Sequence, residues 1–276
     1  MTTRRNFLIS ASGVTTASVM TSLMTATLAG CGGSNPDSTI LISDANLQAE
    51  MNSKLSLELN DATTAKTLVP IQFDVGLTWD LPTIPAPQIN RLVAYSFGNR
   101  PNAASGNTSA NATNQAALPD PGPINEALAD AVHEIYLLKP VKVYAQWEIA
   151  RFLVSKYQMN SSNLVSVEPV TASDGTITYL STDGVAAAII GYEGSAAAMG
   201  NVAVVGHRDH AKRCIETSVA RGMAAAAVAG VNLPVNYDPL SGQPWTRRRD
   251  LYLVHDMYAQ LAVKAAALTS AAYPNG

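Results

Sequence analysis

The chain has 276 residues, of which 47% are apolar, 14% charged and 6% aromatic. A chain this apolar buries enough surface to offset the entropy of ordering, which excludes disorder along its whole length. Its 18 basic and 21 acidic residues give a net charge of −3, so no cationic surface indicates a nucleic-acid partner. The two cysteines exclude a disulfide-stapled scaffold.

The first thirty residues have the layout of an export signal. Arg4 and Arg5 precede an uncharged, weakly apolar stretch that ends in Leu-Ala-Gly-Cys at 28–31. The paired arginines resemble a Tat signal, and the final four residues resemble a bacterial lipobox. A transmembrane helix is the alternative, because the stretch is long enough to span a bilayer. We expect removal of 1–30 and acylation of Cys31, which anchors the protein on the exported side of the cell envelope, on the outer membrane if the host has one.

Between the export signal and the main domain lie a tether and an N-terminal extension. A short Gly/Ser/Pro-rich tether follows Cys31. The pattern over 47–59 predicts an amphipathic helix, and the proline-rich 69–87 is predicted to be extended. The expected organisation is a signal over 1–30, the tether and extension over 31–90, and an α/β domain over 91–276.

Short β-branched or aromatic runs alternate with helical patterns from Arg91 onward. Such fully apolar runs are typical of strands buried on both faces. The predicted strands are 92–97, 141–147, 164–170, 202–206 and 225–231. The predicted helices are one that begins at Pro123, then 147–157, 183–192, 209–222 and 250–267. The alternation predicts a single Rossmann-like domain with a doubly wound, mostly parallel sheet and helices on both faces.

The segment 99–120 is long for a connection inside a compact domain and is rich in Asn, Ala, Ser and Pro. Such connections are either functional covers or disordered segments. The composition favours a mobile segment, and whether it forms an ordered lid stays open.

Polar residues follow the first two predicted strands. In open α/β sheets, ligands bind beyond the carboxyl ends of the strands, near the point where strand order reverses. This rule selects Ser96, Gly98, Asn99 and Arg100 after the first strand, and Gln146 and Glu148 after the second. A carboxylate in a first helical turn also complements the helix dipole, so Glu148 has a structural explanation as well.

The densest polar cluster follows the strand 202–206. It comprises His207, Arg208, Asp209, His210, Lys212 and Arg213. The two histidines suggest a metal site, but the neighbouring basic residues oppose a cation, and we assign no metal. The cluster opens a helix, whose free N–H groups attract anions. One histidine is then an acid or base and Arg213 holds a phosphate or carboxylate. The alternative is structural, with Asp209 capping the helix and the histidines bonded internally.

The remaining polar groups and motifs give weaker evidence of a functional site. The run 247–249 of three arginines is either an anion contact or a solvated turn, and Cys214 is predicted to be a small core residue. His133 and His255 are predicted to be packing or surface residues. The chain lacks the glycine motif of dinucleotide enzymes after its first strand, a Walker loop and a Gly-x-Ser-x-Gly elbow, so those three enzyme classes are unsupported.

Four segments of 90–268 together resemble the YdcF/SanA/ElyC family, a domain of unknown function associated with the bacterial envelope. They are the first strand, 92–98; the helix start Trp-Glu-Ile-Ala at 147–150; Leu-Ser-Thr-Asp-Gly-Val at 180–185; and the strand and helix start at 204–213. In the last segment, His210 and Arg213 fall on the family's His-x-x-Arg motif. The tail from Tyr237 to the final helix is also similar.

The resemblance implies a lipid-anchored envelope protein that binds or processes a phosphate-bearing or other anionic small molecule, or a lipid-linked envelope precursor. His210 and Glu148 are then the catalytic candidates. The ligand-binding candidates are Ser96, Gly98, Asn99, Arg100, Gln146, Thr182, Asp183, His207 and Arg213. The alternative is a non-catalytic envelope binding or assembly module, and no cofactor is implied. A pocket that joins Ser96, Glu148, His210 and Arg213 favours the first hypothesis, and a filled sheet edge favours the second.

Overall fold

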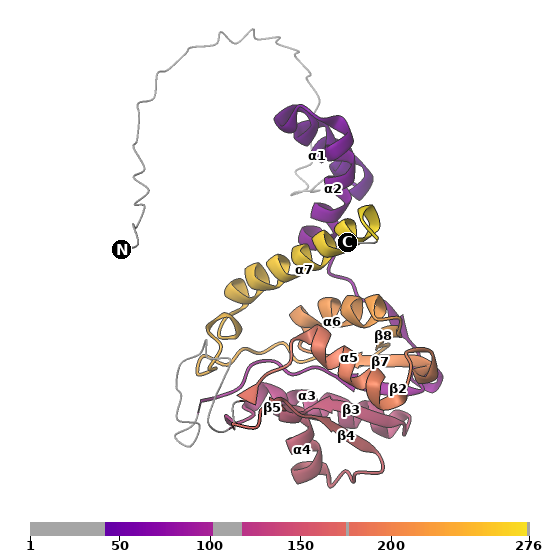
Figure 1. Ribbon diagram of the computed structural model, residues 1–276, viewed down its shortest axis with the longest axis vertical. Helices are drawn as coiled ribbons and strands as arrows, with labels where there is room; N and C mark the ends of the chain where they lie inside the picture. The colour runs from indigo at the N-terminus through magenta and orange to yellow at the C-terminus, as the bar shows by residue number, and fades with distance from the viewer. Residues whose placement is uncertain (1–41, 102–117, 175–176, 275–276) are drawn as a thin grey trace, which may run out of the picture. The chain divides into compact units, whose positions relative to one another are not determined.

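A parallel six-stranded sheet, in the order β1-β8-β7-β2-β3-β4, carries the fold (Figure 1). The computed structural model describes residues 42–101, 118–174 and 177–274. The predicted export signal, acylation site and tether lie outside the described residues, as does most of the segment 99–120. Within the described ranges, no helix combines the length and the apolar character that crossing a bilayer requires.

The strands of the sheet are short and pair in parallel register throughout. They are β1 (Thr83–Ile84), β2 (Arg91–Ala94), β3 (Lys142–Gln146), β4 (Leu164–Val167), β7 (Asn201–Val205) and β8 (Ala224–Val228). A separate antiparallel pair consists of β5 (Val170–Thr171) and β6 (Ile177–Thr178).

The described residues form seven α-helices. They are α1 (Asp44–Leu59), α2 (Ala62–Leu77), α3 (Pro123–Leu138), α4 (Trp147–Tyr157), α5 (Thr182–Glu193), α6 (Arg208–Ala220) and α7 (Arg249–Ala272). Of these, α3, α4, α5 and α6 connect strands and cover the sheet. Short 3-10 turns are η1 (Ala86–Gln88), η3 (Ala197–Met199) and η4 (Pro244–Thr246). The predicted doubly wound, Rossmann-like α/β fold in one domain is confirmed.

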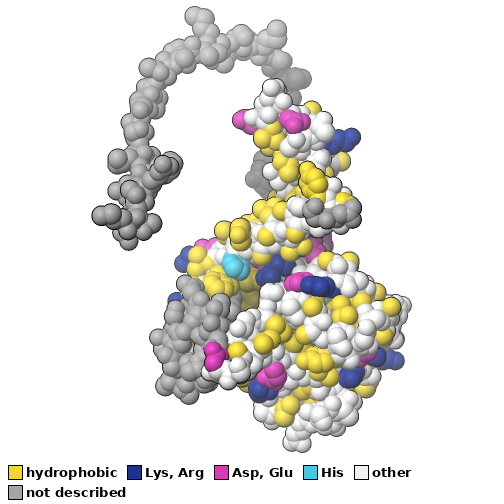
Figure 2. Space-filling view, in the orientation of Figure 1, with side chains coloured by type: hydrophobic (Ala, Val, Ile, Leu, Met, Phe, Trp, Pro, Cys, Tyr) yellow, Lys and Arg dark blue, Asp and Glu magenta, His cyan; other side chains and the backbone are white. Residues whose placement is uncertain are grey.

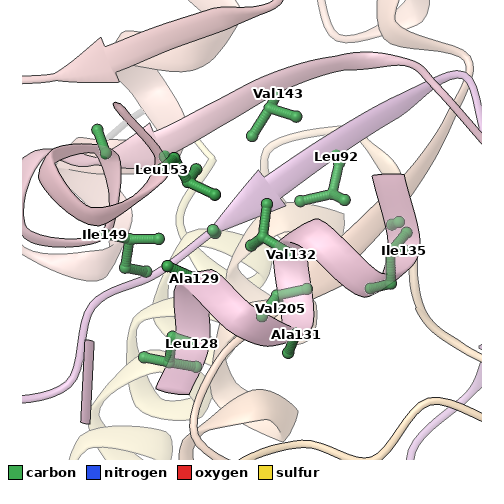
Figure 3. Close-up of a cluster of buried hydrophobic side chains, with 14 of the residues drawn as sticks. Leu92, Leu128, Ala129, Ala131, Val132, Ile135, Val143, Ile149, Leu153 and Val205 are labelled. Carbon is green, nitrogen blue, oxygen red and sulfur yellow. The ribbon is translucent and has the colours of Figure 1, made fainter. Parts of the chain in front are cut away.

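Two hydrophobic clusters lie on the two faces of the sheet. Successive strand residues point to opposite faces, so Leu92 and Ala94 of β2 belong to one cluster, and Val93 and Tyr95 to the other. The first cluster packs against α3 and α4, as the close-up in Figure 3 shows. The second packs against α5 and α6. Because both faces are covered, the strands are apolar along their length, which explains why their runs are visible in the sequence.

The predicted extended conformation over 69–87 is wrong for its first half, which belongs to α2. Asp61 caps this helix, since its Oδ1 accepts a 2.9 Å hydrogen bond from the Thr64 amide. Ala65, Val69 and Phe73 then recur at four-residue spacing and are buried. This burial outweighs the proline at position 70, which removes one helical hydrogen bond.

The segment 31–90 also contributes to the sheet. β1 pairs with β8, although its two residues are too few for a strand pattern to be recognised. Asp74 of α2 contacts α7 through a 2.8 Å ion pair with Lys264. Residues 44–90 therefore belong to the same unit, Asp44–Gly276, as the α/β domain.

A buried asparagine holds the loop that follows β2. The Asn125 side chain accepts from the Phe97 amide at 2.9 Å and donates to the carbonyls of Gly98 and Pro121 at 2.7 and 2.6 Å. Asn125→Ala leaves these backbone groups without their partner, so we expect the free energy of unfolding to fall by about 2–4 kcal/mol. Urea unfolding measures this, with the exposed Glu134→Ala on the same helix as control. A loss under 1 kcal/mol would contradict it.

Candidate functional site

A pocket of about 340 Å³ opens at the carboxyl edge of the sheet. The chain runs from β2 to β3 and β4 on one side, and returns to β7 and β8 on the other, so strand order reverses between β2 and β7. The loop after β2, the start of α4 after β3 and the start of α6 after β7 all line the pocket. It therefore lies at the position where doubly wound folds bind their ligands.

The loop after β2 lines the pocket and is fixed by a hydrogen bond and by close packing. The Ser96 amide donates to Gln146 Oε1 at 3.0 Å, which ties this loop to the end of β3. Gly98 has a φ of +67°, and a Cβ there would lie 2.7 Å from Thr246 Oγ1 and 2.8 Å from Ser241 Oγ. Only glycine satisfies both the backbone angle and the space. Four of the predicted ligand-binding residues line the pocket: Ser96, Gly98, Asn99 and Gln146.

Glu148 brings a buried carboxyl group to the pocket. Its side chain lies in the first turn of α4 and is only 3% exposed. Burial raises the pKa of Glu148 to about 7, while the neighbouring Ser96 and Asn99 lower it by a smaller amount. Among the described residues, Glu148 Oε2 has no hydrogen-bond partner. At neutral pH this carboxyl group therefore accepts or donates a proton readily, and one of its oxygens is available to a ligand.

His210 and Arg213 of α6 line the same pocket, and both contact Asp256 of α7. Arg213 Nε donates to Asp256 Oδ1 at 2.6 Å, and His210 Nδ1 lies 3.6 Å from the same oxygen. Burial and the Arg213 charge lower the pKa of His210 to about 4, so its imidazole is neutral at pH 7. Burial raises the pKa of Asp256, but the hydrogen bonds from His210 and Arg213 and the Arg213 charge outweigh it and hold this pKa well below its usual range.

The guanidinium of Arg213 is oriented by three partners. Besides Asp256, it donates to Thr182 Oγ1 at 2.9 Å and to the Tyr252 hydroxyl at 3.3 Å. A guanidinium has five N–H groups, so two have no partner among the described residues. Because Arg213 lines the pocket, these two are the donors that a ligand can use.

Three helices begin at the pocket. α4 contributes Glu148, α5 begins at Thr182 with Ser181 as its cap, and α6 contributes His210 and Arg213. The first turns of α4 and α5 border the pocket, and their dipoles favour a negatively charged ligand, whereas the first amides of α6 are already bonded to Pro234 and His207.

Three predicted site residues lie outside the pocket lining. Arg100 makes a two-point ion pair with Asp238, at 2.6 and 2.9 Å. Asp183 makes a similar pair with Arg221 on the surface. His207 is fully buried and stacks on Phe97, with a centroid separation of 4.0 Å.

The bonds of His207 are those of a structural residue. Its Nδ1 accepts from the Asp209 amide at 3.3 Å, and its Nε2 lies 3.0 Å from the Asn236 carbonyl oxygen. Burial lowers the pKa of His207 to about 4. His207 thus caps α6, the role that the structural alternative gave to Asp209, whereas Asp209 pairs with Arg208 and Arg249.

The remaining candidates have structural partners. The three arginines at 247–249 bond to the Ser241 carbonyl, to Asp250 and to Asp209. Cys214 is fully buried in the core. In the parts of the chain that the structure describes, no group of three or more His, Cys, Asp or Glu residues is arranged to hold a metal ion.

Several pocket residues were not among the predicted site residues. They include Tyr179, Ser181, Gln243, Trp245 and Tyr252. Asp256 was not predicted either; it is not part of the lining, but it bonds to Arg213, which is. His255, predicted to be a packing or surface residue, stacks on Trp245 at 4.8 Å and also lines the pocket. The one usable signal was the spacing of Tyr252, Asp256 and Gln260, which places three polar groups on one face of an apolar helix.

The fold is that of a doubly wound α/β protein, with a pocket at the switch point of its parallel sheet. Comparison of the chain with protein-family models finds no match. Curated proteins and solved structures likewise give no significant match. The fold class therefore rests on the structure, and the family resemblance remains a hypothesis.

Proposed function

We propose that this pocket binds an anionic small molecule, or the anionic group of a lipid-linked envelope precursor, with a phosphate-bearing ligand as the best fit. The observation that carries the proposal is one pocket lined jointly by Ser96, Glu148, His210 and Arg213. These residues lie up to 117 positions apart in sequence and come from three different strand ends. If the domain were a non-catalytic assembly module, we would expect side chains to fill this edge of the sheet. The pocket at this edge therefore favours ligand binding.

The charges and hydrogen-bond donors at the pocket favour an anionic ligand. The Arg213 charge is balanced by Asp256, so a further negative group is stabilised by the N-termini of α4 and α5 and by the two remaining guanidinium N–H groups. Protonated Glu148 donates one more hydrogen bond, whereas ionised Glu148 repels the ligand. Anion affinity is therefore expected to increase as the pH falls below about 7.

The same groups support acid–base chemistry on the bound molecule. Glu148, with its pKa near 7, is the proton donor or acceptor. Neutral His210 either accepts a proton or donates a hydrogen bond, and Asp256 stabilises its charged form. We infer further that the chain is a lipid-anchored envelope protein of the YdcF/SanA/ElyC type, which rests on the sequence motifs at 28–31 and 204–213.

Mass spectrometry of molecules retained by the purified full chain tests the proposal. Released under denaturing conditions, the ligand is expected to carry a phosphate or another acidic group. Retention of a molecule without an acidic group would contradict the proposal.

Two variants link the ligand to the pocket. His210→Gln and Arg213→Lys each remove a directed hydrogen bond while keeping size or charge, so retained ligand is expected to fall about tenfold or more. Arg151→Lys is the matched control, because Arg151 is half-exposed and pairs with Glu168 away from the pocket lining. Equal ligand retention by all three variants would place the binding site elsewhere.

A further inference from the structure

The outer face of α7 carries an apolar stripe that the described residues leave exposed. Tyr258 is 72% exposed and Val254 is 66% exposed. Figure 2 shows hydrophobic side chains gathered along this helix. We name the following seven exposed residues the α7 stripe: Leu251, Val254, Tyr258, Leu261, Ala265, Leu268 and Ala272.

The opposite face already fixes α7 to the rest of the molecule. Tyr252, Asp256 and Gln260 are buried at four-residue spacing, and Asp256 bonds to Arg213 of α6. The fold therefore does not need the α7 stripe. The exposed face of a surface helix is normally polar, and a contiguous exposed apolar surface marks a site of interaction.

The spacing within the α7 stripe identifies the kind of partner. Its members alternate at three and four residues without interruption, an average period of 3.5, which is the seam of a two-helix coiled coil. The alanines at 265 and 272 let a second helix approach closely, and Tyr258 offers a large aromatic surface near the middle. A neighbouring α-helix with the same spacing fits this seam.

Charge favours a second copy of the same helix. The charged residues of α7 are Arg249, Asp250, Asp256 and Lys264. None of the four belongs to the α7 stripe. Each forms an ion pair, with Asp209, Arg248, Arg213 and Asp74 respectively. Two copies of the α7 stripe therefore meet without charge repulsion. A helix lying on a bilayer surface is typically rich in Lys and Arg on its polar face, which α7 lacks.

We propose that the α7 stripe binds the α7 stripe of a second copy of this chain and forms a two-fold symmetric dimer. Such an interface uses the same surface on both partners, as an uncharged, self-complementary seam requires. The inner face of each helix stays on its own sheet, so each copy keeps its own pocket.

Light scattering coupled to size-exclusion chromatography tests this on the full chain carrying Cys31→Ser, which removes the predicted acylation site. The expected molar mass is twice the chain mass of 29.0 kDa. Adding Tyr258→Glu and Leu261→Glu together is expected to halve it, because two carboxylates enter the seam of each copy. Ala266→Glu, an exposed position on α7 off the stripe, is expected to leave the dimer intact. Circular dichroism verifies that each variant is folded.

A dimer that persists in the folded double variant would overturn the proposal, as would a monomeric wild-type chain. For a monomer, sedimentation with phosphatidylcholine and phosphatidylglycerol vesicles identifies the alternative occupant. Vesicle binding that the double variant loses would assign the stripe to a bilayer. Without vesicle binding, residues 1–43 of the same chain are the remaining candidate.

Discussion

Asp256→Ala is expected to lower the free energy of unfolding at pH 7 by about 3–5 kcal/mol, the largest effect of any substitution at the site. The Asp256 side chain is fully buried and balances the Arg213 charge, while its second oxygen accepts from Gln260 at 2.7 Å. Removing it leaves Arg213, whose side chain is only 16% exposed, as a buried cation without a counter-charge. Urea unfolding measures the loss.

The pH dependence of this effect separates charge from packing. The pKa of Asp256 is lower in the folded than in the unfolded protein, so its contribution is complete well above pH 3.8 and is lost as the pH falls through the folded value. The difference between wild type and Asp256→Ala is therefore expected to shrink in acid. Asp183→Ala, which breaks an exposed pair with Arg221, is the control and is expected to change stability by less than about 1 kcal/mol. Equal losses in both variants would contradict the account.

Glu148→Gln is expected to make the protein more stable than wild type at alkaline pH, by an amount that develops between pH 4.5 and about 7 and is then constant. The pKa of Glu148 is raised from 4.5 to about 7 on folding, so its contribution is complete below pH 4.5 and is lost as the pH rises through 7. The variant has no carboxyl group to ionise. Its stability relative to wild type should increase by about 3 kcal/mol between pH 4 and pH 8.5, measured by urea unfolding.

Two features make this measurement specific. His207 and His210, whose pKa values are lowered to about 4, weaken both proteins as the pH falls below 6.5, and their contribution cancels in the difference. Buffers without phosphate keep an anionic ligand out of the pocket. The control is Glu134→Gln, at an exposed position. Its stability relative to wild type should not change with pH. If the stability of Glu148→Gln relative to wild type also did not change with pH, the Glu148 carboxyl group would not be desolvated.

The fold was predictable because its elements carry strong local signals. The helix over 147–157 follows directly from β3, and its predicted bounds are those of α4. The strands were visible because both faces of the sheet are buried. α2 was missed because Pro70 disfavours a helix locally, and only the burial of Val69 and Phe73 against distant residues outweighs it.

Only those site residues that directly follow a strand could be predicted from the sequence. Ser96, Glu148 and His210 follow three strands and meet in the pocket, as the topology of a parallel sheet requires. Arg100 satisfied the same rule, but Asp238, 138 residues later, engages it in an ion pair. Asp256 lies in the middle of a helix, where its four-residue spacing with Tyr252 and Gln260 indicates a buried polar face but not that this face contacts Arg213.

Nuclear magnetic resonance of the histidine side-chain nitrogens tests the central claim most directly. Titration of the full chain with phosphate monoesters is expected to shift the His210 resonances in a saturable manner, because the bound anion lies beside this imidazole. His133, which stacks on Tyr157 outside the pocket lining, is the internal control and should not shift. Unchanged His210 resonances, or equal shifts at both histidines, would contradict an anion-binding pocket at this edge of the sheet.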